Sequence, residues 1–240
     1  MKKVIIVGAS SGIGKALSYA FAEEGYELGL TARRVELLEQ IKQDFPDRIW
    51  IQHMDVRQSD EAMQGLDRLI QIMQGVDIVV INAGVGYGNE EHLDWWKEKD
   101  TIDVNVLGFA AMCNTAARYF IARKEGHIVG ISSIAALRGH SHAPAYNASK
   151  AFMSNYMEGI RHLFIRRGLK ISVTDVKPGY VDTPMTEGNP GMFWVATPQV
   201  AARQIIQAIK RRKRHVYVTR RWGLIAWLIK RIPRWVHDKV

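Results

Sequence analysis

Short apolar runs alternate with helical patterns along most of the chain. The runs are rich in Val and Ile and nearly continuous, and the segments between them repeat apolar residues every three or four positions. This pattern predicts strands at 3–8, 26–32, 48–55, 76–84, 126–133, 169–179 and 215–219. It predicts helices at 13–25, 35–45, 59–74, 94–123, 146–167 and 197–212. The alternation indicates an α/β fold, with a doubly wound parallel sheet of about seven strands covered by helices on both faces.

Composition adds few constraints to this picture. The 240 residues are 47% hydrophobic and show no internal repeat or low-complexity linker, so we expect one domain over 1–219 and a C-terminal tail over 220–240. The single cysteine, Cys113, excludes an intrachain disulfide and favours a reducing compartment. The apolar run near the start is too short for a signal peptide, and no stretch approaches the ~20 apolar residues that cross a bilayer. A cytoplasmic location is therefore expected.

The net charge of +9 comes from the end of the chain. Residues 210–240 carry eleven Lys or Arg and one acidic residue, whereas the rest carries 22 basic and 23 acidic residues. The body is therefore close to neutral and the tail is basic. The run KRRKRH at 210–215 is the one hint of nucleic-acid binding, and it contains no aromatic residue for base stacking. No nucleic-acid partner is expected.

A glycine-rich turn joins the first strand to the first helix. Gly8, Gly12 and Gly14 permit a tight turn and close approach of the backbone to a pyrophosphate, which the positive end of the helix then stabilises. A phosphate loop of the Walker type would need a glycine at Ala9 and a hydroxyl at Ala16. These glycines therefore favour a dinucleotide site.

The same turn matches two weaker alternatives. The G-x-S-x-G pattern over residues 8–12 also fits a nucleophile elbow, but only one strand precedes it. A turn that merely lets a helix pack on a strand is the other alternative, and it explains one glycine better than three.

The end of the second strand bears on the choice of cofactor. Residues 31–35 contain no acidic residue that could hold a ribose 2′-hydroxyl, whereas Arg33 and Arg34 could hold a 2′-phosphate. This favours NADP(H) over NAD(H), which stays open as a second cofactor. Two arginines that only solvate a helix start are the alternative, although positive charge is mildly unfavourable there.

Five further motifs follow the glycine turn in order: INAG at 81–84, VNVLG at 104–108, ISS at 131–133, YNASK at 146–150 and KPGYVDTPM at 177–185. With them the chain resembles the compact short-chain dehydrogenase/reductase family from residue 3 to about 185. Val7 and Ile81 stand where that family often has Thr and Asn. The resemblance implies a Rossmann-like fold, an NADP(H)-dependent carbonyl reductase or alcohol dehydrogenase, and a homodimer or homotetramer. A non-catalytic NADP(H) sensor or scaffold on the same fold is the alternative.

The resemblance also implies a catalytic tetrad of Asn105, Ser133, Tyr146 and Lys150. Tyr146 would be the general acid/base, Ser133 would stabilise the substrate oxygen, and Asn105 would hold a water that links Lys150 to solvent. Tyr146 and Lys150 are four residues apart, so a helix places them on one face, where an ammonium would lower the pKa of the phenol. For this pair alone, a surface contact is the alternative. Ser132 would face the other side of the strand.

Further residues are expected to contact the cofactor. Asp55 fits the family's adenine-contacting acid, although a helix cap is its alternative and Ser59 suits a cap better. His140 and His142 precede Tyr146 without a third ligand in the sequence, so no metal site is expected. The predicted cofactor contacts are Gly8, Ser10, Ser11, Gly12, Ile13, Gly14, Arg33, Arg34, Asp55, Val56, Asn82, Ala83, Gly84, Tyr146, Lys150, Pro178, Gly179, Val181 and Thr183.

A lid over the substrate is expected near 183–198. Met185, Met192, Phe193 and Trp194 would give it an apolar lining, which favours a small hydrophobic carbonyl or secondary alcohol as substrate. The alternative is that these side chains belong to the core around the last helices.

The tail over 220–240 predicts an amphipathic helix that Pro233 bends. Arg221 and Trp227 do not fit the pattern. We therefore hypothesise peripheral contact with an anionic membrane at the inner surface of the cell, and packing over the substrate pocket or a neighbouring subunit is an equal alternative. The predicted apolar face holds Leu224, Ile225, Leu228, Ile229, Ile232, Trp235 and Val236, and the basic face Arg220, Lys230, Arg231 and Arg234.

Overall fold

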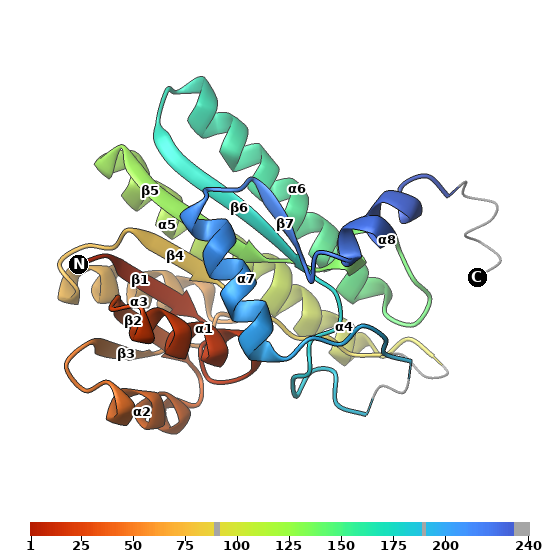
Figure 1. The fold of residues 1–240 in the computed structure, drawn as a ribbon, viewed down its shortest axis with the longest axis horizontal. Helices are drawn as coiled ribbons and strands as arrows, with labels where there is room; N and C mark the ends of the chain where they lie inside the picture. The colour runs from red at the N-terminus through yellow and green to blue at the C-terminus, as the bar shows by residue number, and fades with distance from the viewer. Residues whose placement is uncertain (89–91, 189–190, 233–240) are drawn as a thin grey trace.

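The computed structural model describes residues 1–88, 92–188 and 191–232, which build around one parallel sheet (Figure 1). The sheet has seven strands in the order β3-β2-β1-β4-β5-β6-β7, and every neighbouring pair is parallel. The prediction of a doubly wound parallel sheet is confirmed. The strands are β1 (Lys3–Val7), β2 (Glu27–Ala32), β3 (Ile49–His53), β4 (Ile78–Ile81), β5 (Glu125–Ile131), β6 (Lys170–Pro178) and β7 (His215–Val218).

Helices cover both faces of the sheet, and they fall into two groups by the core to which they contribute. In the first group, α1 contacts α7, and Figure 1 shows both helices in front of the sheet. In the second group, α3 contacts α5. The first group is α1 (Gly12–Glu23), α2 (Val35–Asp44) and α7 (Pro198–Lys210), and the second is α3 (Ser59–Ile72), α5 (Phe109–Arg123) and α6 (Pro144–Arg166).

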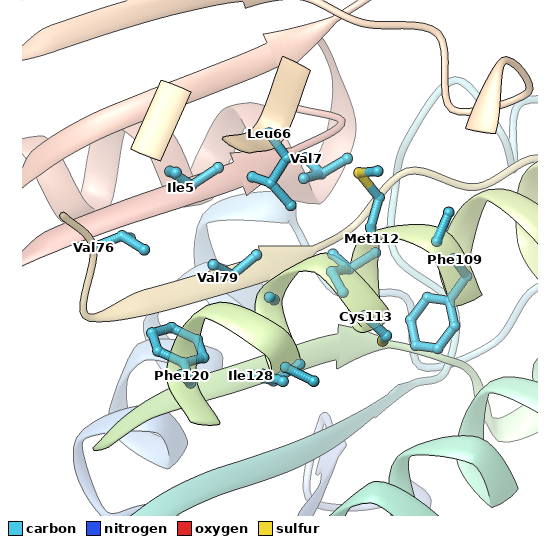
Figure 2. Close-up of a cluster of buried hydrophobic side chains, with 14 of the residues drawn as sticks. Ile5, Val7, Leu66, Val76, Val79, Phe109, Met112, Cys113, Phe120 and Ile128 are labelled. Carbon is cyan, nitrogen blue, oxygen red and sulfur yellow. The ribbon is translucent and has the colours of Figure 1, made fainter. Parts of the chain in front are cut away.

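Two hydrophobic cores explain why the strands read as nearly continuous apolar runs. Along β1, Val4 and Ile6 point into one core, whereas Ile5 and Val7 point into the other, because successive side chains of a strand alternate between faces. Figure 2 shows the second of these cores, where Ile5 and Val7 meet Leu66 of α3 and Met112 of α5. A sheet with both faces buried positions its strand ends rigidly.

The helix predicted over 94–123 is interrupted in the structure. It consists of α4 (Trp95–Ile102), a π-helical segment (Asp103–Gly108) and α5. The wider π turn carries Asn105, and π bulges often serve to place a functional side chain. Periodicity alone cannot show one extra residue in a helical turn, so the prediction missed the break.

The C-terminal helix α8 (Trp222–Ile229) is shorter than the predicted tail helix and buries a different side. Trp222 and Ala226 are buried, whereas Leu224 and Leu228 of the predicted apolar face are exposed. Leu224 and Leu228 of the predicted apolar face are therefore not covered by the described part of the chain. The parts of the tail prediction that concern residues 233–240, including Pro233, Arg234, Trp235 and Val236, lie outside the described residues.

The strand order places a crevice at the carboxyl edge of the sheet. The chain runs from β1 outward to β2 and β3 and then returns to β4 on the other side of β1. Loops after β1 and β4 therefore leave in opposite directions, which is where open α/β sheets bind ligands. The glycine turn after β1 and the segment after β4 both lie at this point.

Candidate active site

A cleft of about 240 Å³ opens at the carboxyl edge of the sheet. Of the residues predicted for catalysis and cofactor contact, all line this cleft except Gly14 and Asn105. The lining comes from the ends of several strands, so residues far apart in the sequence meet here. The cleft runs from the glycine turn to Tyr146, so an extended ligand could lie along the turn with its reacting group near Tyr146.

The glycine turn fixes the start of α1 against β1. Gly8 has φ +87°, a conformation that favours glycine, and a Cβ on Gly14 would lie 2.1 Å from the carbonyl oxygen of Gly8. The side-chain amide of Asn82 donates to that same oxygen at 2.6 Å. The Ser11 side chain caps no amide at the start of α1. Gly12 and Ile13, the first two residues of α1, line the cleft, so the start of this helix lies where an anion site is expected.

Arginine and serine side chains gather at one end of the cleft. The guanidinium of Arg34 donates to the hydroxyls of Ser10 and Ser11, each at 3.2 Å. Arg33 also lines the cleft. Two guanidinium groups with two hydroxyls form a site that suits a phosphate.

Tyr146 and Lys150 lie on one face of α6 at the other end of the cleft. The ammonium of Lys150 is 5.5 Å from the centre of the Tyr146 ring and donates to the carbonyl oxygen of Ile131 at 3.0 Å. Gly86 lies against the Tyr146 ring, since a Cβ there would come within 2.9 Å of it. Lys150 is buried, which disfavours the alternative of a solvated surface pair.

The ionisation of Tyr146 differs from the expectation. Burial raises the pKa of the Tyr146 phenol, and a hydrogen bond with Ser133 only partly offsets this effect. Burial also lowers the pKa of Lys150 to about 8. The expectation that Lys150 lowers the pKa of Tyr146 is not met by the groups of the chain, because desolvation of the phenol is the largest effect and the group that opposes it is Ser133.

Ser132 and Ser133, which follow β5, both line the cleft, but their hydroxyls have different partners. Ser133 lines the cleft, and its hydroxyl accepts from the amide of Ala135 at 3.1 Å. The hydroxyl of Ser132 instead donates to the carboxylate of Asp175, which is paired with the buried ammonium of Lys177. Ser133 is thus the serine that is placed beside Tyr146.

Asn105 lies just behind the cleft rather than in its wall. Its side-chain oxygen accepts from the amide of Val85 at 2.9 Å, and its nitrogen donates to the carbonyl oxygen of Val85 at 2.7 Å and to the hydroxyl of Ser149 at 3.0 Å. A Cβ on Gly84 would lie 3.3 Å from both the Asn105 oxygen and the Lys150 ammonium. Asn105 therefore holds the segment after β4 against α6, close to Lys150.

Asp55 lies in the cleft wall, but its carboxylate is already paired. Both oxygens accept from the Nε of Arg57, at 3.1 and 3.0 Å, and this interaction lowers the pKa of Asp55 against the effect of burial. Ser59 is the first residue of α3, and the cap position belongs to Gln58, whose side chain makes no capping bond. The expectation that Ser59 caps this helix was wrong.

The loop before α6 and the segment predicted as a lid both make packing contacts within the chain. His142 packs against Gly88, and the described residues contain no group of three His, Cys, Asp or Glu side chains that could hold a metal. Phe193 and Trp194 contact each other and the indole of Trp222, with ring centres 5.0 Å apart for Phe193 and Trp222. The segment predicted as a lid therefore packs on α8 through these two side chains.

The sequence did not predict that Trp222 and Tyr180 would lie beside the cleft. The ring of Trp222 covers Gly179, where a Cβ would lie 2.0 Å from it, and it packs edge-on to Tyr180 at 5.6 Å. Gly179 lines the cleft, so α8 braces the turn after β6. Trp222 belongs to neither of the two faces that the sequence assigned to the tail helix, so its burial was not predicted.

This fold and cleft are typical of a nucleotide-binding α/β protein, and Ser133, Tyr146 and Lys150 lie together at the carboxyl edge of its sheet. The profile of the family described as short chain dehydrogenase matches residues 2–191. The chain therefore belongs to the short-chain dehydrogenase/reductase family of oxidoreductases.

Relatives and solved structures agree with this assignment. An uncharacterized oxidoreductase of Myxococcus xanthus is 34% identical over 192 residues, which is 78% of this chain and 75% of the relative. The 11-beta-hydroxysteroid dehydrogenase 1A of Arabidopsis thaliana is 31% identical over 240 residues, covering 90% of this chain and 67% of the relative.

Two solved structures share the fold at low sequence identity. An alcohol dehydrogenase from Thermococcus sibiricus, complexed with 5-hydroxy-NADP, has a TM-score of 0.81 at 24% identity, covering 90% of this chain and 95% of its own. A short-chain dehydrogenase/reductase from Burkholderia phymatum, in complex with NAD, has a TM-score of 0.86 at 20% identity, covering 95% and 92%.

Proposed function

We propose that the protein is an NADP(H)-dependent oxidoreductase that interconverts a carbonyl and a secondary alcohol. The observation that carries this proposal is the convergence of Ser133, Tyr146 and Lys150 on the cleft that the glycine turn opens. When bound, the nicotinamide cofactor supplies or accepts the hydride. The chain supplies the position of the substrate and the proton.

Tyr146 acts as the general acid in the direction of reduction. Because burial raises its pKa, the phenol keeps its proton at neutral pH and can donate it to the oxygen of a carbonyl substrate. Ser133, which lies beside Tyr146 in the cleft, donates to the same oxygen and stabilises the negative charge that develops there. The buried ammonium of Lys150 stabilises the phenolate that remains, and it binds the ribose of the cofactor.

Asn105 acts as a positioning residue in this scheme. It fastens Val85 to α6 through hydrogen bonds to both Val85 and Ser149, and it lies beside the Lys150 ammonium. A water held at this place would resupply protons to Lys150 from solvent. The proton taken from Tyr146 is then replaced without opening the cleft.

The preference for NADP(H) follows from the charge at the far end of the cleft. Arg33 and Arg34 line this end, and Arg34 donates to the hydroxyls of Ser10 and Ser11, so donors that could bind a phosphate are already gathered there. No acidic residue in 31–35 competes for a ribose 2′-hydroxyl. A 2′-phosphate is the group that this end of the cleft recognises best.

The substrate is a small apolar molecule. Met185 lines the cleft, and the lid that follows it exposes Phe193 and Trp194. The relationship to an 11-beta-hydroxysteroid dehydrogenase supports an apolar alcohol or ketone as the substrate class. The expected homodimer or homotetramer and the cytoplasmic location stay predictions, and sedimentation velocity tests the first of them.

The test is consumption of NADPH with a panel of aldehydes, ketones and 3-oxoacyl thioesters. Turnover with at least one carbonyl substrate is the expected result. Tight NADPH binding without turnover on any member of the panel would favour the alternative, a sensor or scaffold that binds NADP(H). That alternative leaves the burial and hydrogen bonding of Ser133, Tyr146 and Lys150 without a purpose.

A further inference from the structure

Large apolar side chains are exposed beside the lid. Leu224 is 68% exposed, Trp227 54% and Leu228 49%, although each lies in a well-formed helix. Their spacing of three and four residues puts them on one stripe of α8, directed away from the buried Trp222. We call this exposed stripe the rim surface: Leu224, Trp227 and Leu228 of α8.

The rim surface is attached firmly to the catalytic cleft. Trp222, on the opposite side of α8, is 3% exposed and packs against Phe193, Trp194 and Tyr180. Its ring also covers Gly179, which lines the cleft. Because β7 is parallel to the other strands and α8 follows it, α8 lies at the carboxyl edge of the sheet, where Figure 1 shows it.

Positive charge surrounds the rim surface. Between Glu187 and Asp238 the sequence contains no acidic residue. The guanidinium of Arg231 lies 4.0 Å from the ring centre of Trp227, and that of Arg221 lies 5.5 Å from the ring of Trp194. Arginine beside tryptophan is the combination that keeps an apolar face at the depth of lipid headgroups while the charge reaches phosphate.

The charge selects the occupant of this surface. In a symmetric pair of subunits the same patch faces itself, so the basic residues of two copies would repel across the contact. An anionic lipid surface instead complements both the apolar stripe and the cations around it. Within the described part of the chain no helix is long and apolar enough to cross a membrane, and α8 spans only about 12 Å. It can lie in the interface rather than pass through it.

We propose that the rim surface binds the headgroup region of an anionic bilayer and holds the mouth of the cleft against the membrane. An apolar substrate then reaches the cleft from the lipid, a consequence that rests on the proposed function. The binding itself does not depend on catalysis, and it is measured without any substrate.

The test is co-sedimentation of the full chain with vesicles of phosphatidylcholine containing phosphatidylglycerol, and with vesicles of phosphatidylcholine alone. Binding to the anionic vesicles that weakens as salt rises is the expected result. Leu224→Glu with Leu228→Glu should abolish it, because two charges would enter the apolar interface. Both leucines are exposed, so this variant should keep the NADPH affinity and the thermal stability of the wild type.

Charge-matched variants locate the surface. Arg221→Glu with Arg231→Glu should weaken binding to anionic vesicles by at least about 30-fold. Arg211→Glu with Arg214→Glu changes the net charge equally in the exposed loop before β7, at the opposite edge of the sheet, and should keep most of the binding. Ile165→Glu, at an exposed apolar position near the end of α6, is the matching control for the leucines.

Three outcomes would overturn the proposal. The first is no binding to anionic vesicles at low salt, and the second is an equal loss with the Arg211 and Arg214 pair. The third is a dimer in sedimentation velocity that the Leu224 and Leu228 variant splits, since the rim surface would then be a subunit contact. None of these outcomes bears on turnover of a soluble carbonyl substrate, so the proposed function would stand or fall separately.

Discussion

Removal of the two arginines beside the glycine turn should change which cofactor the protein selects. Arg33→Ala with Arg34→Ala leaves the hydroxyls of Ser10 and Ser11 in place and takes away the two guanidinium groups at that end of the cleft. NADPH and NADH differ only in the 2′-phosphate, so an effect on NADPH alone reports contact with that group.

The size of the effect follows from the exposure of these side chains. A hydrogen bond to a charged group contributes about 1.5–3 kcal/mol, and the lower end applies because both arginines are exposed. About 1.5 kcal/mol for each arginine corresponds to roughly a tenfold loss per residue, or about 100-fold for the pair. NADH affinity should change by less than about threefold, since neither arginine has a phosphate to bind there.

The assay is equilibrium titration with each cofactor, followed through the fluorescence of the reduced nicotinamide. Arg118→Ala is the matched control, because Arg118 is an exposed arginine paired with Asp67 and is not among the residues that line the cleft. Raising salt should weaken NADPH binding in the wild type more than in the double variant. Equal losses for NADPH and NADH would refute the argument that these arginines recognise the 2′-phosphate.

Three other substitutions test the structure through its stability. Lys150→Met should impair cofactor affinity and turnover yet raise the melting temperature near pH 7. The folded pKa of Lys150 is about 8 against an ordinary 10.5. Between these pH values the folded lysine has lost its proton while the unfolded lysine still holds one, so the wild type becomes more stable as pH rises and the gain from Lys150→Met should shrink. A gain that grows there would contradict this linkage. Gly14→Ala should lower the free energy of unfolding by about 1–3 kcal/mol, because its Cβ would lie 2.1 Å from the Gly8 oxygen. A Cβ on Gly159 in α6 would have no atom within 4 Å, so Gly159→Ala should raise the free energy of unfolding in urea by about 0.5–1 kcal/mol. A lower free energy of unfolding for Gly159→Ala would contradict this expectation.

Sequence periodicity predicted the sheet well because both faces of each strand are buried. Runs such as Val4 to Val7 can satisfy two cores at once, and only a covered parallel sheet offers two. The π-helical segment that carries Asn105 was not predictable in the same way, because one additional residue in a turn leaves the apolar spacing nearly unchanged.

The residues of the cleft could be named from ordered motifs, but their ionisation could not. Ser133, Tyr146 and Lys150 lie together as the family resemblance implied, since each occupies a rigid strand end or helix face. The pKa of Tyr146 depends on how far the surrounding chain excludes water, which a sequence does not state. The same is true of Trp222, which is buried by contacts with a lid that precedes it by almost thirty residues.

The central claim is that the Tyr146 hydroxyl transfers the proton in this cleft. The most direct measurement is a comparison of Tyr146→Phe with the wild type, in which NADPH affinity and the rate of NADPH oxidation with a carbonyl substrate are determined separately. Tyr156→Phe, at a half-buried tyrosine of the same helix, is the control and should keep wild-type turnover. We expect unchanged NADPH affinity and a rate at least about 100-fold lower for Tyr146→Phe. A rate near that of the wild type would contradict the central claim.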